Sequence, residues 1–146
     1  MMRRPITVIL LLLGTLCSAR ERPYASLQGD TLRLGNALIE RTFLWNDGDL
    51  RTIALKDKQA GTVSPVSNSR PDFIIGRLKG EGGVLEVRDV PATALQPAYL
   101  LACIRYTLGG AEVRREFRIY ADVPAIACDT YLKGSLSGDL AGKAAS

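Results

Sequence analysis

ALIERTFLWNDGDLRTIALKDKQAG, residues 37–61, decides the fold of this 146-residue chain, because two runs of alternating residues meet there at one turn signal. The connection Asn46-Asp47-Gly48 has the composition of a short hairpin turn, with Gly48 expected at positive φ. Successive side chains of a strand point to opposite faces, so each run presents one apolar face. These faces contain Ile39, Arg41, Phe43 and Trp45 in the first run and the apolar pair Ile53 and Leu55 in the second. The stretch therefore predicts a β-hairpin.

Short strands of the same texture are predicted on both sides of this hairpin. They cover residues 24–27, 31–34, 73–75, 84–90, 99–108, 113–120 and 125–132, and a surface loop covers 62–71. The inward-facing residues are expected to include Leu85, Val87, Val113, Arg115, Phe117 and Ile119. No window of eleven or more residues carries apolar positions at helical spacing without a glycine or proline. The sequence predicts an all-β fold, namely an antiparallel β-sandwich. Its last three strands are expected to form a meander with one face exposed to solvent.

The first nineteen residues have the pattern of a signal peptide. Basic residues precede an apolar run that is too short to span a bilayer, and cleavage fits after Ala19. We expect an exported protein, periplasmic or extracellular, without a membrane span. A lipid anchor on Cys17 is the less favoured alternative, because Leu16 is larger than a lipoprotein signal peptidase usually accepts.

The sandwich domain is assigned to residues 20–133. From residue 134 the composition changes to Gly, Ser, Ala, Asp and Lys, and no closing strand is recognisable. Residues 134–146 are therefore interpreted as a linker-like or truncated tail, and the sandwich is expected to be incomplete.

Composition excludes several classes of enzyme. The chain contains no histidine, the commonest metal ligand and the commonest general base at neutral pH, so no metal or cofactor site is expected. Its net charge is +4, part of which comes from the predicted signal peptide, and this charge does not indicate a polyanionic partner. Cys103 and Cys128 could form one disulfide in an exported protein, or could each serve as a small buried hydrophobe, and the sequence leaves both open.

Acidic residues give no clear catalytic pair. Asp47 and Asp49 are close enough in sequence for glycoside hydrolysis, but they flank Gly48, where aspartate is favoured for backbone hydrogen bonds in a turn. Asp129 could be a buried acid, although a solvent-facing strand position is favoured. No catalytic residue is assigned.

Two further groups have a functional and a structural interpretation. Arg114, Arg115 and Arg118 could contact phosphates, but neighbouring glutamates favour a solvated sheet face, and no nucleic-acid partner is expected. Trp45 at the hairpin tip could stack on a sugar, because an exposed indole offers a flat apolar face to pyranose C–H groups. It also continues the apolar face of Phe43, so a core position is the stronger interpretation.

Three segments together resemble a known family: GDTLRLGNALIERTFLWNDGDLRTIALKDKQAGT (29–62), RPDF (70–73) and REFRIYADVPAIACDTYLKG (115–134). The chain resembles the N-terminal β-sandwich region of secreted α-galactosidase-like glycoside hydrolases of Bacteroidetes, of the melibiase, family 36 type. The resemblance implies a supersandwich-like fold that packs beside a (β/α)8 barrel. In that family the barrel supplies both catalytic aspartates, and no position of this sequence matches them.

Two functional hypotheses follow from these observations. The leading one is a non-catalytic fragment of an exported glycoside hydrolase, which supports a carbohydrate-cleaving barrel absent from this chain and is inactive alone. Its partners would be carbohydrate, through the parent enzyme, and the missing (β/α)8 domain. The alternative is a stand-alone exported module that binds glycans or a cell surface, with Trp45 as the possible sugar contact.

Overall fold

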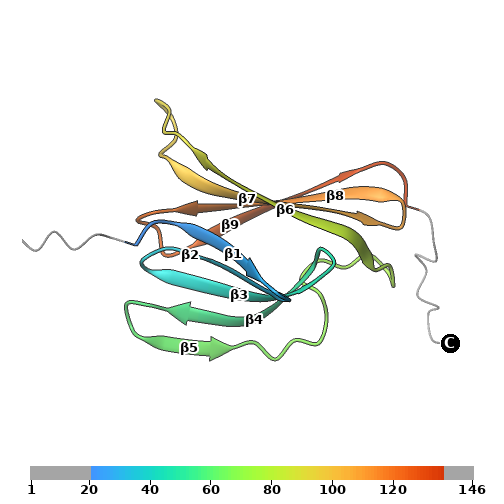
Figure 1. The fold of residues 1–146 in the computed structure, drawn as a ribbon, viewed down its shortest axis with the longest axis horizontal. Coiled ribbons are helices and arrows are strands. Elements are labelled where there is room, and N and C mark those ends of the chain that lie inside the picture. The colour runs from blue at the N-terminus through green and yellow to red at the C-terminus, as the bar shows by residue number, and fades with distance from the viewer. Residues whose placement is uncertain (1–20, 137–146) are drawn as a thin grey trace, which may run out of the picture.

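Two antiparallel sheets lie face to face in the computed structural model, which describes residues 21–136 (Figure 1). The first sheet has the order β1 (Tyr24–Gln28), β2 (Thr31–Gly35), β3 (Ile39–Asn46), β4 (Asp49–Asp57) and β5 (Thr62–Pro65). The second has the order β6 (Gly80–Val90), β7 (Tyr99–Leu108), β8 (Ala111–Tyr120) and β9 (Ile126–Lys133). The prediction of an all-β antiparallel sandwich is confirmed. The predicted signal peptide with Cys17, and most of the predicted tail, lie outside the described residues.

Strand neighbours in sequence are also neighbours in each sheet, so both sheets are meanders. The central hairpin is β3 and β4, joined by a two-residue turn in which Asp47 and Gly48 have φ of 50° and 100°. Positive φ at both central residues is the signature of a type I′ turn, which matches the twist of the paired strands. The part of the chain that the structure describes contains no helix long and apolar enough to cross a bilayer.

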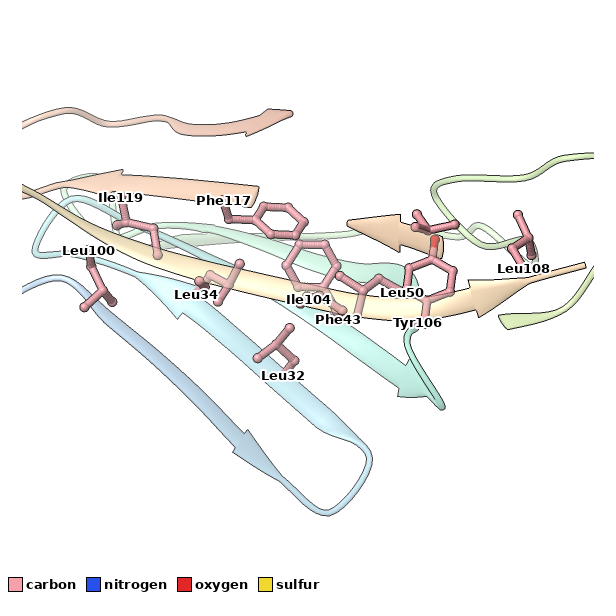
Figure 2. Packing of buried hydrophobic residues seen from close by; sticks show 12 residues of the cluster. Leu32, Leu34, Phe43, Leu50, Leu100, Ile104, Tyr106, Leu108, Phe117 and Ile119 are labelled. Carbon is pink, nitrogen blue, oxygen red and sulfur yellow. The ribbon is translucent and has the colours of Figure 1, made fainter. Parts of the chain in front are cut away.

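The core lies between the sheets and is centred on β2, β3, β7 and β8 (Figure 2). Phe43 from one sheet meets Phe117 from the other edge-to-face, with ring centroids 5.6 Å apart, a favourable geometry for aromatic quadrupoles. The fully buried apolar side chains are Leu32, Leu34, Phe43, Leu50, Ala102, Ile104, Leu108, Ala111, Val113, Phe117 and Ile119. On β8 every second residue is buried, as predicted, including Arg115.

The apolar pair Ile53 and Leu55 of β4 does not enter the core, and a bulge interrupts the register at Ile53. Phe43 pairs with Thr52 and the preceding Thr42 with Ala54, so Ile53 is an extra residue without a partner on β3. Leu50 and Thr52 are buried instead, and Leu55 is 39% exposed. A bulge reverses the alternation that a strictly period-two pattern assumes.

Two further strand predictions fail near the connection between the sheets. Residues 73–75 form no strand but part of the loop that crosses from β5 to β6, where Phe73 and Ile75 pack on the core from the side. The predicted surface loop begins with strand β5, which is exposed throughout. Val87, on the edge strand β6, pairs with Ala102 of β7 but remains 44% exposed. Leu85, on the same strand, packs against the core as expected.

Asn36 joins the two sheets at one end of the sandwich. Its side chain is completely buried, and Nδ2 donates hydrogen bonds to the carbonyl oxygens of Tyr120 (2.6 Å) and Val123 (2.7 Å) in the β8–β9 connection. Its Oδ1 accepts hydrogen bonds from the backbone N–H groups of Leu38 and Ile39. All the polar atoms of this buried amide are therefore satisfied, and one residue fixes two turns against each other.

Candidate functional site

The turn at Asp47 and Gly48 joins the sheets at the opposite end. Asp49 is buried, and its Oδ2 accepts a hydrogen bond from the backbone N–H of Gly80 (2.9 Å). Asp47 accepts hydrogen bonds from the backbone N–H groups of Gly82 (3.0 Å) and Gly83 (3.2 Å). The preferred interpretation of these acids as turn residues is confirmed, and they also hold the start of β6 in place.

Glycine is required where these two segments touch. A Cβ added at Gly83 would lie 2.3 Å from the backbone nitrogen of Gly48, and one added at Gly48 would lie 2.5 Å from Cβ of Tyr106. Only residues without a Cβ allow the two backbones to approach so closely. Both carboxylates are thus occupied by structural hydrogen bonds, which is not the arrangement of a free acid and base across a cleft.

Trp45 lies at this end of the sandwich, where it contacts the core and also lines a cleft. It pairs with Leu50 across the hairpin, and its backbone N–H donates to the carbonyl oxygen of Asp30 (2.7 Å). The side chain is partly buried and packs against the core, and it also lines a cleft of about 900 Å³. The core contact is confirmed, and the sugar contact stays a prediction.

The cleft is closed on its far side by the loop between β5 and β6, which is fixed to β4. The backbone N–H of Val66 donates to Ile53, and that of Asp72 donates to Leu50 (2.7 Å). The loop then turns at Leu78, whose N–H donates to the carbonyl oxygen of Ile75. The cleft thus has one wall from the hairpin and one from a loop with defined anchors.

The strongest anchor is a polar cluster of Arg41, Thr52 and Asp72. Asp72 accepts hydrogen bonds from the backbone N–H (2.9 Å) and the hydroxyl (2.5 Å) of Thr52, and it pairs with Nη2 of Arg41 at 2.8 Å. The Arg41 and Asp72 side chains are 27% and 11% exposed, so the pair is shielded from solvent more than a surface ion pair is. The carboxylate of Asp72 is therefore structural as well.

Cationic side chains outnumber acidic ones around the cleft. Arg51, Arg70, Arg77 and Lys79 line it, against Asp30 and Asp49. Asp49 already accepts the N–H of Gly80, and Arg51 donates to the carbonyl oxygen of Asn68 at 3.3 Å. Within residues 21–136 the side chains of Arg70, Arg77 and Lys79 form no hydrogen bond or ion pair. This positive rim is the feature that sequence reasoning missed.

The three arginines of β8 do not form one basic surface. Arg114 and Arg118 share the outer face, where they pair with Glu116 (3.3 Å) and Asp129 (2.6 Å). Asp129 is thus partly exposed and pairs with Arg118, which agrees with the predicted solvent-facing strand position. Arg115 alone points between the sheets.

Tyr106 is buried, and burial raises the pKa of its phenol to about 12. It belongs to the core and offers no ring face to a ligand.

The two cysteines are free and lie on opposite faces of one sheet. Cys103 pairs with Glu116 and Cys128 with the adjacent Phe117, so their side chains point away from each other. Cys103 is buried, and burial raises the pKa of its thiol. Cys128 is exposed on the edge strand β9. The buried-hydrophobe interpretation therefore holds for Cys103 only. The described residues contain no cluster of three or more acidic, cysteine or histidine side chains that could hold a metal ion.

The flank beside β9 is open. Inward-facing β9 residues opposite the buried part of β8 are exposed, including Cys128, Thr130 and Leu132, the last at 50%. Next to them Arg115 is only 5% exposed and lies 5.2 Å over the ring of Phe117, and its Nε and Nη1 have no hydrogen-bond partner within the described residues 21–136. Its Nη2 has a weak contact with the sulfur of Cys128 at 3.7 Å.

Comparison with known proteins adds no neighbour. No family model, curated protein or solved structure matches the chain.

Proposed function

We propose that this chain is the non-catalytic β-sandwich of an exported glycoside hydrolase of the α-galactosidase-like type, and that its open β9 flank rests against the catalytic (β/α)8 domain. The observation that carries the proposal is the uncovered face of β9 beside Arg115, a buried cation that forms no ion pair within residues 21–136. The sequence resemblance to the sandwich region of that family supports the same role.

Burial without a partner makes Arg115 costly to the isolated chain. A buried charge is tolerated when it is paired and hydrogen-bonded, and an unpaired one costs several kcal/mol. Nε and Nη1 of Arg115 are closed to solvent, so a neighbouring domain would pack on the exposed face of β9, where it would cover Leu132. The flank therefore suits an apolar partner surface, and an acidic residue near Arg115 would lower the cost of its buried charge.

A substitution separates this role from a purely internal one. Arg115→Met removes the unpaired charge and keeps an unbranched chain, so it is expected to stabilise the isolated chain by about 1–4 kcal/mol. The matched control is Arg88→Met, because Arg88 is an exposed cation of β6 and its loss changes stability by less than about 0.5 kcal/mol. Thermal unfolding measures both. Destabilisation by Arg115→Met would show that the guanidinium is already satisfied, and the docking role would be withdrawn.

Activity provides the direct test. The purified chain is expected to give no release of aryl leaving group from aryl α-galactosides above a protein-free blank. Turnover that survives rechromatography would refute the non-catalytic role.

The second candidate is a stand-alone glycan-binding module, and the Trp45 cleft favours it. Clefts of this size, with an aromatic wall and a few polar groups, suit small ligands. Trp45 is the sole tryptophan, so its fluorescence reports directly on the cleft without any label. A saturable change in emission during a sugar titration supports binding, and an unchanged spectrum at millimolar sugar contradicts it. Trp45→Phe, which keeps a ring against the core, serves as the spectroscopic blank.

A further inference from the structure

We propose that the Trp45 cleft binds an acidic oligosaccharide, whose carboxylate or sulfate group lies on the cationic rim formed by Arg70, Arg77 and Lys79. This inference rests on the glycan-binding role of the cleft and adds the class of sugar to it. The relevant features are the charges on the rim, their freedom from internal partners and the position of the aromatic wall.

The side chains of Arg70, Arg77 and Lys79 form no ion pair or hydrogen bond with the other described residues. The other basic residues near this end are committed, because Arg41 pairs with Asp72 and Arg51 donates to Asn68. Arg77 and Lys79 are exposed and two residues apart in a loop. Cations that line one cleft and form no ion pair among the described residues favour an anionic ligand.

The anchors of the loop give the rim a defined position. Asp72 fixes one side to β4, and the N–H of Gly80 on Asp49 fixes the other. Between them Phe73 and Leu78 pack on the core, which turns the intervening polar side chains outward. Binding then costs less ordering of the backbone than a free loop would require.

Aromatic and charged groups occupy different parts of the cleft. Trp45 comes from the end of β3, and the unpaired cations come from the loop wall. A pyranose ring can stack on the indole while its acidic substituent reaches a guanidinium, which binds carboxylate and sulfate oxygens in pairs. The carboxylate of Asp30, also on the cleft, can accept sugar hydroxyls. A neutral sugar would satisfy only the stacking and hydroxyl contacts.

Titration of the full chain with three probes tests the proposal, followed by Trp45 fluorescence and calorimetry. The probes are tetragalacturonate, galactotetraose sulfated on its hydroxyl groups, and neutral galactotetraose. The double variant Arg77→Gln/Lys79→Gln is expected to weaken acidic-sugar binding by about tenfold, as the loss of two exposed charge contacts predicts. Raising sodium chloride from about 0.05 M to about 0.5 M should weaken wild-type binding through screening. The control variant is Arg88→Gln/Arg105→Gln, which removes the same charge from the strand pair β6 and β7.

The outcomes distinguish the charge inference from the glycan-binding role. Acidic probes that bind more tightly than galactotetraose, with loss in the rim variant alone, support the proposal, and the better acidic probe identifies carboxylate or sulfate. Equal or tighter binding of galactotetraose overturns the acidic specificity and leaves the glycan-binding role intact. Equal losses in both double variants overturn the rim as the site. Absence of binding by all three probes overturns both.

Discussion

Asn36→Ala tests whether the two sheets are held together by single polar residues at their ends. The wild-type amide is completely buried and makes four hydrogen bonds, two to carbonyl oxygens near β9 and two from N–H groups after β2. A buried hydrogen bond contributes about 1 kcal/mol net, and polar groups left without partners cost more. We expect a loss of about 3–4 kcal/mol in the free energy of unfolding.

Thermal and chemical unfolding of the purified chain measure this loss. For a domain of this size about 3–4 kcal/mol corresponds to a fall of about 10–20 °C in Tm. Asn68→Ala is the matched control, because the exposed side chain of Asn68 accepts one hydrogen bond, from the N–H of Arg70, and its loss should cost less than about 1 kcal/mol. A loss of less than about 1 kcal/mol for Asn36→Ala would refute the idea that this residue fixes the sheets together.

Asn36→Asp separates the donor from the acceptor. The variant keeps an oxygen for Leu38 and Ile39 but turns a second oxygen toward the carbonyls of Tyr120 and Val123. Only a protonated carboxyl can donate to a carbonyl, so folding should raise the pKa of the new group above its unfolded value. The stability of this variant is then expected to be greatest at low pH and to fall as pH rises through the folded pKa. Stability that rises over the same range would contradict the assigned donor role.

Three other predictions concern particular groups. Gly83→Ala should lower the free energy of unfolding by about 2 kcal/mol, because the new Cβ would meet the backbone of the hairpin turn. The control Gly61→Ala, in open space at φ 65°, should lower it by about 1 kcal/mol. Equal losses in chemical unfolding would contradict the close approach at Gly83. In a chain that carries Cys17→Ser, Ellman's reagent should titrate Cys128 in the native state and Cys103 only after unfolding, and two fast thiols would contradict the burial of Cys103. Burial raises the pKa of Tyr106 from 10.0 to about 12. The stability that comes from its neutral phenol should therefore be complete below pH 10.0 and lost as pH rises toward about 12. An equal loss of stability in wild type and Tyr106→Phe over this range would refute the prediction.

The strands could be predicted because their pattern is local. Turn chemistry at Asp47 and Gly48 and alternation on β8 both follow from the intrinsic geometry of a strand. The bulge at Ile53 could not be predicted in this way, because it depends on which residues of the partner strand pair with β4. The bulge places Leu55 opposite Arg41, on the same strand face as Phe43, so its exposure reflects a position beyond the core and not a reversed face.

The cleft could not be predicted from alternation at all. Its loop wall has no periodicity, and its position depends on Asp72 reaching Thr52 and on Gly80 reaching Asp49, contacts between residues far apart in sequence. Trp45 could be singled out because aromatic residues at a turn are rare enough to notice. Its cationic neighbours are separated from it by the whole of β4 and β5, so only the fold brings them together.

The same turn links the structural role of Asp47 and Asp49 to the cleft that lies beside them. Asp47 and Asp49 hold β6 through backbone N–H groups, and this attachment determines where the chain enters the second sheet. Because the entry point is fixed, the preceding loop runs along the hairpin, and its residues Arg77 and Lys79 line the same cleft as Trp45. The structural use of the carboxylates is therefore a condition for the cleft, and loss of the Asp49 contact should displace the rim even where Trp45 stays packed on the core.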